Sequence, residues 1–440
     1  MGKYQAYPEY KDSGVEWLGG IPEHWEVTRH KYVAVFKKGK NPEFLLDDFE
    51  DGAVRYLSMD YLRGGSTSLY ALPERSSYLA SKGQVLIIWD GSNAGEFVEG
   101  EDGIVSSTMA AAEYLANINK SFYWYLCQCL EPEMRRHAVG MGIPHVNGTE
   151  LKNSVIVLPT KGEQEKIANF LDHETAKIDT LIDKQQQLIQ LLKEKRQAVI
   201  SHAVTKGLNP NAPMRDSGVE WLGEVPEHWD VLKINLLFSE SSERAKTANE
   251  LEYPVLSVSI HHGISDKELN EEELDRKVQR SEDRSLYKVV HRNYLAYNMM
   301  RAWQGGFGAS KLSGLVSPAY VVCNPKSLMD SYYFELVLRT SNAVTELKRF
   351  SRGITDFRLR LYWDEFKNIR IPVPPKSEID EILKSISDTN LVYEKLVIAA
   401  EQQIRLLQER RTALISAAVT GKIDVRNWES PDSAQNKEAV

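Results

Sequence analysis

Two segments of the chain place apolar residues at alternating spacings of three and four, the pattern of helices that pack along a common seam. These positions are Leu171, Ile178, Leu181, Leu188, Leu192 and Val199 in the first segment and Ile386, Tyr393, Leu396, Leu407 and Leu414 in the second. Polar residues on the same seams, which would help to fix register or partner, are Gln185, Lys195, Gln403 and Arg410. The pattern predicts two long helices that form a coiled coil.

Proline and acidic residues mark where both helices start. Pro159 and Pro374 stand where each helix should begin, and Glu163 and Glu378 fall in the first turn, where the helix dipole favours negative charge. A helix from about residue 163 to 204 would be roughly 60 Å long at about 1.5 Å per residue. Such a helix is long enough to act as a spacer.

The two stretches outside these helices, residues 26–158 and 230–373, have a different pattern. Short apolar runs at 85–89 and 294–300 predict buried strands, each followed by a glycine-containing loop. One helix is expected in each stretch, near residues 122–130 and 332–350. We predict two globular α+β domains, domain 1 and domain 2, joined by the long helices.

An internal repeat organises the whole chain. Residues 12–19, DSGVEWLG, recur unchanged at 216–223, and Pro-Glu-His-Trp recurs at 22–25 and 226–229, an offset of 204. A second repeat, at an offset of 215, begins at Leu151 and Phe366 and continues to the helix ends, LLKEKRQAVISHAVT and LLQERRTALISAAVT. The chain is therefore two copies of one unit, a pseudo-twofold internal repeat. We call residues 12–25 and 216–229 the leads.

Composition narrows the possible functions. A chain of 440 residues exceeds what one hydrophobic core usually serves. No apolar run is long enough to span a membrane, and the first residues lack the apolar core of a signal peptide. Three cysteines can form neither a disulfide framework nor a four-ligand zinc site, so we expect reduced thiols in the cytoplasm. The net charge of −8 argues against a protein that coats nucleic acid nonspecifically.

The order of these motifs resembles the specificity (S) subunits of type I restriction-modification systems over nearly the full length. The resemblance rests on the duplicated lead, the K-N-x-x-I-x-x-P strand that closes each domain, and the A-(V/L)-I-S-x-A-V-T helix end. Three further fragments, at 142–147, 300–306 and 316–320, are typical of the recognition domains of that family.

The resemblance implies that each domain recognises one half of a split target in double-stranded DNA. The two helices would pack as an antiparallel coiled coil, set the length of the unread gap, and bind two methyltransferase subunits. Restriction and motor subunits would complete the enzyme. S-adenosylmethionine, ATP and Mg are expected on those partners, and this chain is expected to carry no cofactor.

The resemblance also divides the chain. Residues 1–159 would hold the N-terminal lead and target-recognition domain 1, 160–208 the central helical arm, 209–374 the second lead and target-recognition domain 2, 375–423 the C-terminal arm, and 424–440 a flexible tail.

Base reading needs polar or basic side chains presented toward a DNA groove, with further basic residues on phosphates. In domain 1 the candidates are Lys37, Lys38, Lys40, Arg63, Ser92, Asn93, Ser106, Ser107, Thr108 and His145. In domain 2 they are His261, His262, Arg301, Gln304, Ser310, Lys311, Arg358 and Arg360. An ordinary solvated or capping role is an equal alternative for each residue alone, so the prediction rests on the set.

Catalytic signatures are missing from the sequence. It has no phosphate-binding P-loop, no complete glycine-rich cofactor fingerprint and no Asn-Pro-Pro-aromatic motif of amino-methyltransferases. Asp330 with Glu346 and Lys348 only imitates nuclease spacing, and the glycines of 305–308 are interpreted as a turn or a loop near DNA. We therefore expect a non-catalytic chain without a metal. The alternatives are a purely structural coiled-coil scaffold and an enzyme with its own cleavage or methylation activity.

The repeated aromatic residues of the leads could be imagined as base-stacking platforms. These residues are Trp17, Trp25, Trp221 and Trp229. Because their setting is identical in both halves, whereas readers of different half-sites should differ, we expect them to pack against an arm or a domain. We likewise expect His24 and His228 to be partly buried structural residues.

Overall fold

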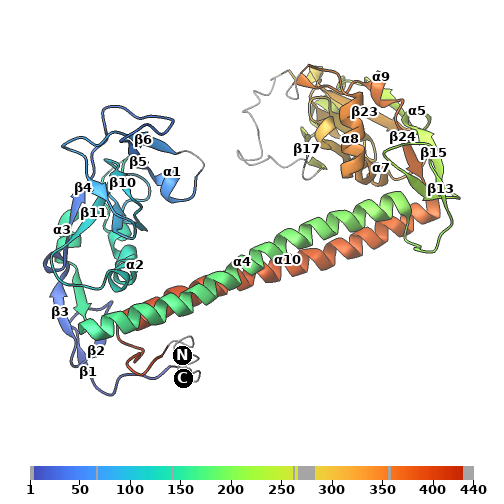
Figure 1. Ribbon diagram of the computed structural model, residues 1–440. Helices are drawn as coiled ribbons and strands as arrows, with labels where there is room; N and C mark the ends of the chain where they lie inside the picture. Colours follow the sequence, from blue (N-terminus) through green and yellow to red (C-terminus); the bar gives the residue numbers. More distant parts are fainter. Residues whose placement is uncertain are drawn as a thin grey trace. The chain divides into compact units, whose positions relative to one another are not determined.

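The computed structural model describes residues 4–65, 68–140, 142–260, 263–265, 283–354 and 358–429. The chain divides into two compact units, unit 1 (residues 1–185 and 402–440) and unit 2 (residues 186–401). Both divisions fall inside the two long helices, α4 (Lys161–Lys206) and α10 (Lys376–Val419). Each unit therefore contains a globular domain and one part of each helix (Figure 1).

Unit 1 begins with the first lead and domain 1. Its strands are β1 (Tyr10–Asp12), β2 (Gly20–Pro22), β3 (Glu26–Arg29), β4 (Ala34–Lys38), β5 (Val54–Leu57), β6 (Leu69–Ala71), β7 (Leu79–Ala80), β8 (Val85–Ile88), β9 (Phe97–Glu99), β10 (Gly103–Val105), β11 (Met109–Tyr114) and β12 (Val155–Leu158). Its short helices are α1 (Met59–Leu62), α2 (Lys120–Arg136) and α3 (Gly148–Asn153). The main sheet of domain 1 has the strand order β4-β11-β8-β9, with all neighbours antiparallel.

Unit 2 repeats this arrangement with different residues. Its strands are β13 (Met214–Asp216), β14 (Glu224–Pro226), β15 (Asp230–Lys233), β16 (Phe238–Ser241), β17 (Ser257–Ser259), β18 (Gly263–Ser265), β19 (Lys288–Val290), β20 (Leu295–Asn298), β21 (Phe307–Ala309), β22 (Gly314–Val316), β23 (Tyr320–Pro325) and β24 (Arg370–Val373). Its short helices are α5 (Ile234–Leu237), α6 (Ala248–Leu251), α7 (Ser331–Leu338), α8 (Ser341–Phe350) and α9 (Trp363–Phe366). The main sheet has the order β16-β23-β20-β21, which matches that of domain 1 strand for strand.

The α+β class and the strands expected near residues 85 and 294 are confirmed as β8 and β20. The helix expected at 122–130 is longer, because α2 continues through Pro132 to Arg136. The single helix expected at 332–350 is wrong. It is two helices, since Thr340 has an extended backbone and its hydroxyl caps α8 by accepting from the Ala343 N–H.

Each domain is closed by pairing its first strand with its last. In domain 1, β3 pairs with β12 antiparallel, and in domain 2, β15 pairs with β24 in the same way. The leads form two further matching hairpins, β1-β2 and β13-β14. The repeat seen in the sequence is therefore a repeat of backbone topology as well.

A buried carboxylate joins the first lead to the start of α4. Glu163 accepts hydrogen bonds from Trp25 Nε1 at 3.2 Å, Tyr7 Oη at 3.3 Å and Thr160 Oγ1 at 2.8 Å. His24 Nε2 lies 2.8 Å from the same carboxylate. Burial raises the pKa of Glu163, but the hydrogen bonds outweigh this effect, so its pKa lies below the ordinary value.

The second lead is joined to the start of α10 by the same device. Glu378 accepts from Trp229 Nε1 at 3.0 Å and lies 2.8 Å from His228 Nε2. Trp25 and Trp229 are fully buried. The expected packing role of the lead tryptophans is confirmed for these two. The expectation that His24 and His228 are partly buried is wrong, because both are exposed, although each contacts the carboxylate at a helix N-terminus.

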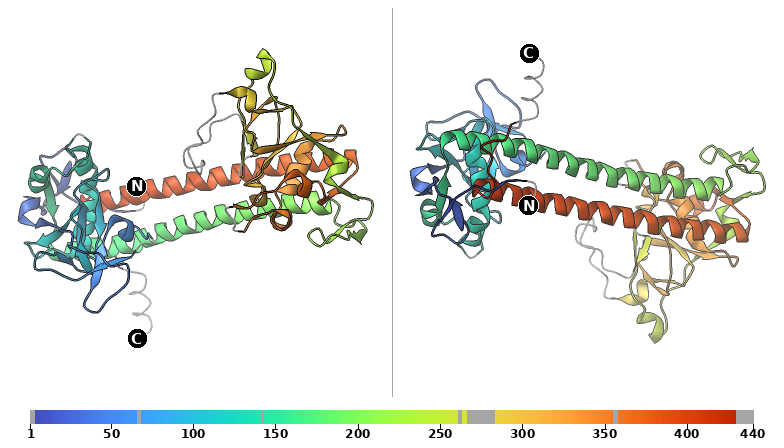
Figure 2. Two further views of the ribbon diagram at one scale, coloured as in Figure 1. Left: turned by 90° about the horizontal axis from the view of Figure 1, so that it is seen from above. Right: turned by 90° about the horizontal axis from the view of Figure 1, so that it is seen from below.

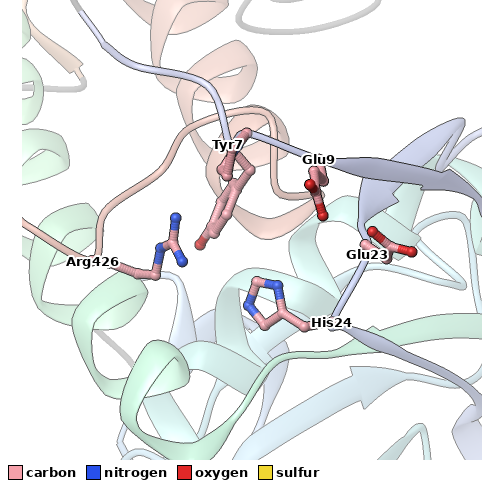
Figure 3. A pocket seen from close by; sticks show the side chains of 6 residues that line it. Tyr7, Glu9, Glu23, His24 and Arg426 are labelled. Carbon is pink, nitrogen blue, oxygen red and sulfur yellow. The ribbon is translucent and has the colours of Figure 1, made fainter.

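The N-terminal residues meet the C-terminal segment in unit 1. Figure 3 shows a pocket of about 270 Å³ between them, in which the Arg426 guanidinium lies over the Tyr7 ring. Asp424 donates its backbone N–H to Gln5, and Val425 is 1% exposed. Residues 424–428 therefore pack on unit 1. The prediction that the flexible tail begins at residue 424 placed its start too early. Residues 430–440 lie outside the described residues.

In each unit the parts of α4 and α10 lie side by side and run in opposite directions (Figure 2). The predicted seam is correct at buried Leu171, Ile178, Ile386 and Leu414, while Leu192, Tyr393 and Leu407 are half-buried. The predicted seam is wrong at Leu181, Leu188, Val199 and Leu396, which are between 38% and 47% exposed. At these places the seam uses the next residue, which is Ile182, Ile189, Ile200 or Val397. At each of these places two apolar residues are adjacent, so the sequence pattern fits a seam through either of them equally well.

The polar residues of the seam differ from those expected. Lys195, Gln403 and Arg410 are exposed, whereas Gln185 is half-buried. In unit 1, Arg411 Nε donates to Asp179 Oδ1 at 2.9 Å. In unit 2, Arg196 Nε donates to Asn390 Oδ1 at 2.7 Å. The two arginines are equivalent under the 215-residue offset but have different partners, so the polar contacts help define which helix segments pair.

None of the helices in the described part of the chain combines the length and the apolar character that crossing a bilayer requires.

Candidate nucleic-acid interface

Two loops occupy equivalent places in the two domains, residues 89–96 between β8 and β9 and residues 299–306 between β20 and β21. A second segment closes over the start of each loop. In domain 1 the Val146 N–H donates to the Trp89 carbonyl at 2.8 Å, and in domain 2 the Leu361 N–H donates to the Met299 carbonyl at 3.0 Å. The loops therefore share a backbone framework, which would let unlike side chains take equivalent positions.

Several candidates of domain 1 meet at the 89–96 loop. Lys38 Nζ lies 2.6 Å from Asp90 Oδ2. The backbone of Asp90 forms an isolated β-bridge with that of His145. The Thr108 carbonyl accepts from the Trp89 and Asp90 N–H groups at 2.7 and 3.2 Å. Ser92 and Asn93 lie in the loop itself. Lysine, histidine, hydroxyl and amide groups are thus gathered at one end of the main sheet.

The remaining candidates of domain 1 lie around this cluster. Lys40 Nζ donates to Ser76 Oγ at 3.0 Å, and the Ser107 N–H donates to Asn41 Oδ1 at 2.9 Å. Successive side chains of a strand point to opposite faces, so the Lys37 side chain of β4 lies on the other face of the sheet from Lys38. Its Nζ lies 3.9 Å from Glu113 Oε2. Arg63 lies 2.5 Å from Glu96, at the far end of the loop.

The candidates of domain 2 gather less completely. Arg301 Nη1 donates to Gln304 Oε1 at 2.8 Å within the 299–306 loop. Arg360 is exposed, and its backbone forms an isolated β-bridge with that of Arg352. Because Arg360 precedes Leu361, it lies beside the start of the loop. Arg358 is exposed in the same segment. Lys311 lies beyond the other end of β21, away from the loop.

Burial removes two residues from the candidate set. Ser106 is 3% exposed and shares a 2.9 Å hydrogen bond with Thr108, and Ser310 is 4% exposed and donates to the Leu312 carbonyl. Both side chains are satisfied inside the protein, so neither presents a free donor to a DNA base. His261 and His262 lie outside the described residues.

Sequence reasoning missed the acidic partners of these basic groups. Asp90 and Glu96 hold Lys38 and Arg63, and two Glu-x-x-x-Arg pairs lie behind the loops, Glu131 with Arg135 and Glu335 with Arg339. The offset of 204 that relates the leads also relates these pairs, which was the available signal. Within the described residues, no group of three or more His, Cys, Asp or Glu side chains is arranged to hold a metal ion.

The fold is shared with a solved structure of a chain from a type I restriction-modification system, determined to explain complex assembly and conformational transition. The two chains are 14% identical, the match covers 92% of this chain and 99% of the other, and the TM-score is 0.55. Residues 22–191 also match the family model described as the type I restriction modification DNA specificity domain.

Sequence relatives agree with this fold. The chain is 33% identical to the MjaVIII specificity subunit of Methanocaldococcus jannaschii over 51% of its own length, and it spans about half (52%) of that relative. It is 21% identical to the EcoBI specificity subunit of Escherichia coli, over 98% of this chain and 94% of that protein. The chain is therefore similar to type I restriction enzyme specificity subunits, and the family model of their DNA specificity domain matches its residues 22–191.

Proposed function

We propose that this chain recognises a bipartite DNA sequence, one half with each domain, on behalf of partner enzyme subunits. The observation that carries the proposal is the matched pair of main sheets, which hold loops 89–96 and 299–306 at equivalent positions with different side chains. Two unlike readers on one repeated framework suit two unlike half-sites. A purely structural scaffold would not need two dissimilar domains.

The cluster at the 89–96 loop supplies the chemistry for readout. Asn and Gln side chains recognise adenine, Arg and Lys side chains recognise guanine, and Ser and Thr hydroxyl groups can form hydrogen bonds with several bases. The ion pairs of Lys38 and Arg63 are exposed at the lysine and arginine side chains, so these cations can exchange a carboxylate for a phosphate. Local cations of this kind allow DNA binding despite a net charge of −8.

We also propose that catalysis belongs to the partners. Two methyltransferase subunits would carry S-adenosylmethionine, and restriction and motor subunits would carry ATP and Mg. The assembly would act in the cytoplasm, and the length of the helical arms would set the unread gap.

The exposed leucines of the arms support two equivalent partner contacts. Leu181 and Leu406 are 47% and 49% exposed in unit 1, and their repeat equivalents Leu396 and Leu191 are 47% and 61% exposed in unit 2. Exposed leucines duplicated at an offset of 215 fit two copies of one partner with an apolar helix face.

A domain exchange tests the proposal. The chain is co-expressed with a methyltransferase partner, and the modified bases are mapped by sequencing. Replacing residues 26–158 with the domain of another family member should change one half of the methylated motif and leave the other half intact. A change in both halves, or DNA binding without sequence preference by the whole complex, would refute two independent readers.

A further inference from the structure

The second-to-last residue of each candidate reading loop is a glycine that lies close to a helix end. Gly95 has φ +96°, and a Cβ there would lie 2.7 Å from the Arg135 backbone nitrogen. Gly305 has φ +85°, and a Cβ there would lie 3.8 Å from the Arg339 Cα. Both loops therefore approach the residues that follow one turn after a glutamate, Glu131 in α2 and Glu335 in α7.

Those glutamates hold the strand that leaves each loop. Glu131 Oε2 accepts from the Phe97 N–H of β9 at 3.1 Å, and Glu335 Oε2 accepts from the Ala309 N–H of β21 at 2.8 Å. β9 and β21 are the last strands in their main sheets. A carboxylate is a strong acceptor for a backbone N–H that no other strand of the sheet accepts.

The arginines extend the contact in a domain-specific way. Arg135 Nε lies 2.9 Å from Glu131 while its Nη2 lies 2.8 Å from Glu96, the last residue of the 89–96 loop. Arg339 Nη1 lies 2.8 Å from Glu335 while its Nη2 donates to the Ile260 carbonyl at 2.8 Å. Each guanidinium therefore bridges its glutamate to a second chain segment. A lysine lacks the planar fork that holds these two contacts in a fixed geometry.

The pairs are equivalent although their surroundings are not. Glu131 and Glu335 differ by 204 residues, as do the arginines, yet LEPEMRR and FELVLRT share only the glutamate and the arginine. The contact recurs in two domains whose other loop residues have diverged. A purely packing role would be open to many residue pairs, whereas both domains use the same charged one.

The geometry points to Glu131–Arg135 and Glu335–Arg339 as positioning residues that hold the 89–96 and 299–306 loops for DNA readout, each for its own half-site. The inference rests on the proposed function, because it assigns the fixed loops to base recognition. The pairs need not touch DNA. They act by fixing the backbone from which the reading side chains extend.

The test uses the full chain in complex with its methyltransferase partner, with Arg135→Lys and Arg339→Lys made separately. Each variant should relax discrimination roughly five- to hundredfold at positions of one half-site only, a different half for each variant, as expected when a base contact is misplaced. The matched controls are Arg136→Lys, which faces Glu133 on the same helix, and Arg349→Lys, which faces Glu346 on α8. Both controls should leave the motif unchanged.

Thermal unfolding and a loop variant separate the possible failures. A lowered Tm with an unchanged motif would show that a pair is only structural, and relaxation of both half-sites by one variant would refute local action. Ser92→Ala with Asn93→Ala tests the loop itself. If this loop variant changes the motif and Arg135→Lys does not, the positioning role is wrong. If neither changes the motif, the assignment of the loop to base reading fails as well.

Discussion

Replacing Glu163 with glutamine should loosen the first lead from α4. The carboxylate is 6% exposed and accepts from Trp25, Tyr7 and Thr160. In Glu163→Gln one oxygen becomes an NH₂ group that faces other donors, so at least one hydrogen bond to a buried charged group is lost. Such a bond contributes about 1.5–3 kcal/mol. We expect a loss of about 2 kcal/mol, or a Tm lower by about 4–8 °C for a unit of this size.

The pH dependence follows from the direction of the pKa shift. Because the pKa of folded Glu163 lies below its ordinary value of 4.5, its stabilising contribution is present above that value and is lost as the pH falls through the lowered pKa. The difference in Tm between wild type and Glu163→Gln should therefore shrink in acid.

Differential scanning calorimetry between pH 3 and pH 7 measures this difference. Glu165→Gln is the matched control, since Glu165 is exposed two residues further along the same helix and the charge change is identical. Equal shifts for the two variants at neutral pH would refute the anchoring role of Glu163.

Two further predictions concern a buried histidine and the exposed leucines. Burial lowers the pKa of His30 to about 4, so the unfolded chain binds a proton that the folded chain does not, and stability should fall by up to about 1.4 kcal/mol per pH unit between pH 6.5 and 4. His30→Gln should flatten this slope in urea titrations, and an unchanged slope would assign it to other groups. Leu181→Glu or Leu396→Glu should each weaken one of the two proposed methyltransferase contacts by at least about tenfold. Native mass spectrometry would then show complexes with one partner copy, and retention of both copies, as expected for exposed Gln187→Glu, would contradict the assignment.

The sequence predicted the repeated framework well because the repeat is carried by residues with demanding local roles. Trp25 and Glu163 contact each other, as do Trp229 and Glu378, so both halves kept the same residue types at these positions. Periodicity located the two long helices because their seam residues likewise have demanding local roles. It could not choose between Leu181 and Ile182, because the partner helix that selects one of them is more than 200 residues away in sequence.

The candidate interface was less predictable. A loop residue such as Ser106 has the right chemistry for DNA contact, but its burial depends on Thr108 and on the strands beneath it. The Glu-x-x-x-Arg pairs were missed because their glutamates accept hydrogen bonds from the backbone N–H groups of Phe97 and Ala309. Sequence patterns do not display contacts of this kind. Local propensity predicts elements, whereas the contacts between loops and helix ends depend on tertiary structure.

The division of unit 1 into two distant stretches of chain affects how the protein is made. Unit 2 is one continuous segment, whereas unit 1 needs residues 402–419 of α10 to cover the half of α4 that was synthesised first. On the ribosome, Ile178 and Ile182 must therefore wait, uncovered, until all of unit 2 has been translated. This interval is when the nascent chain is most open to misassociation, and it makes completion of the first-made unit the last folding event.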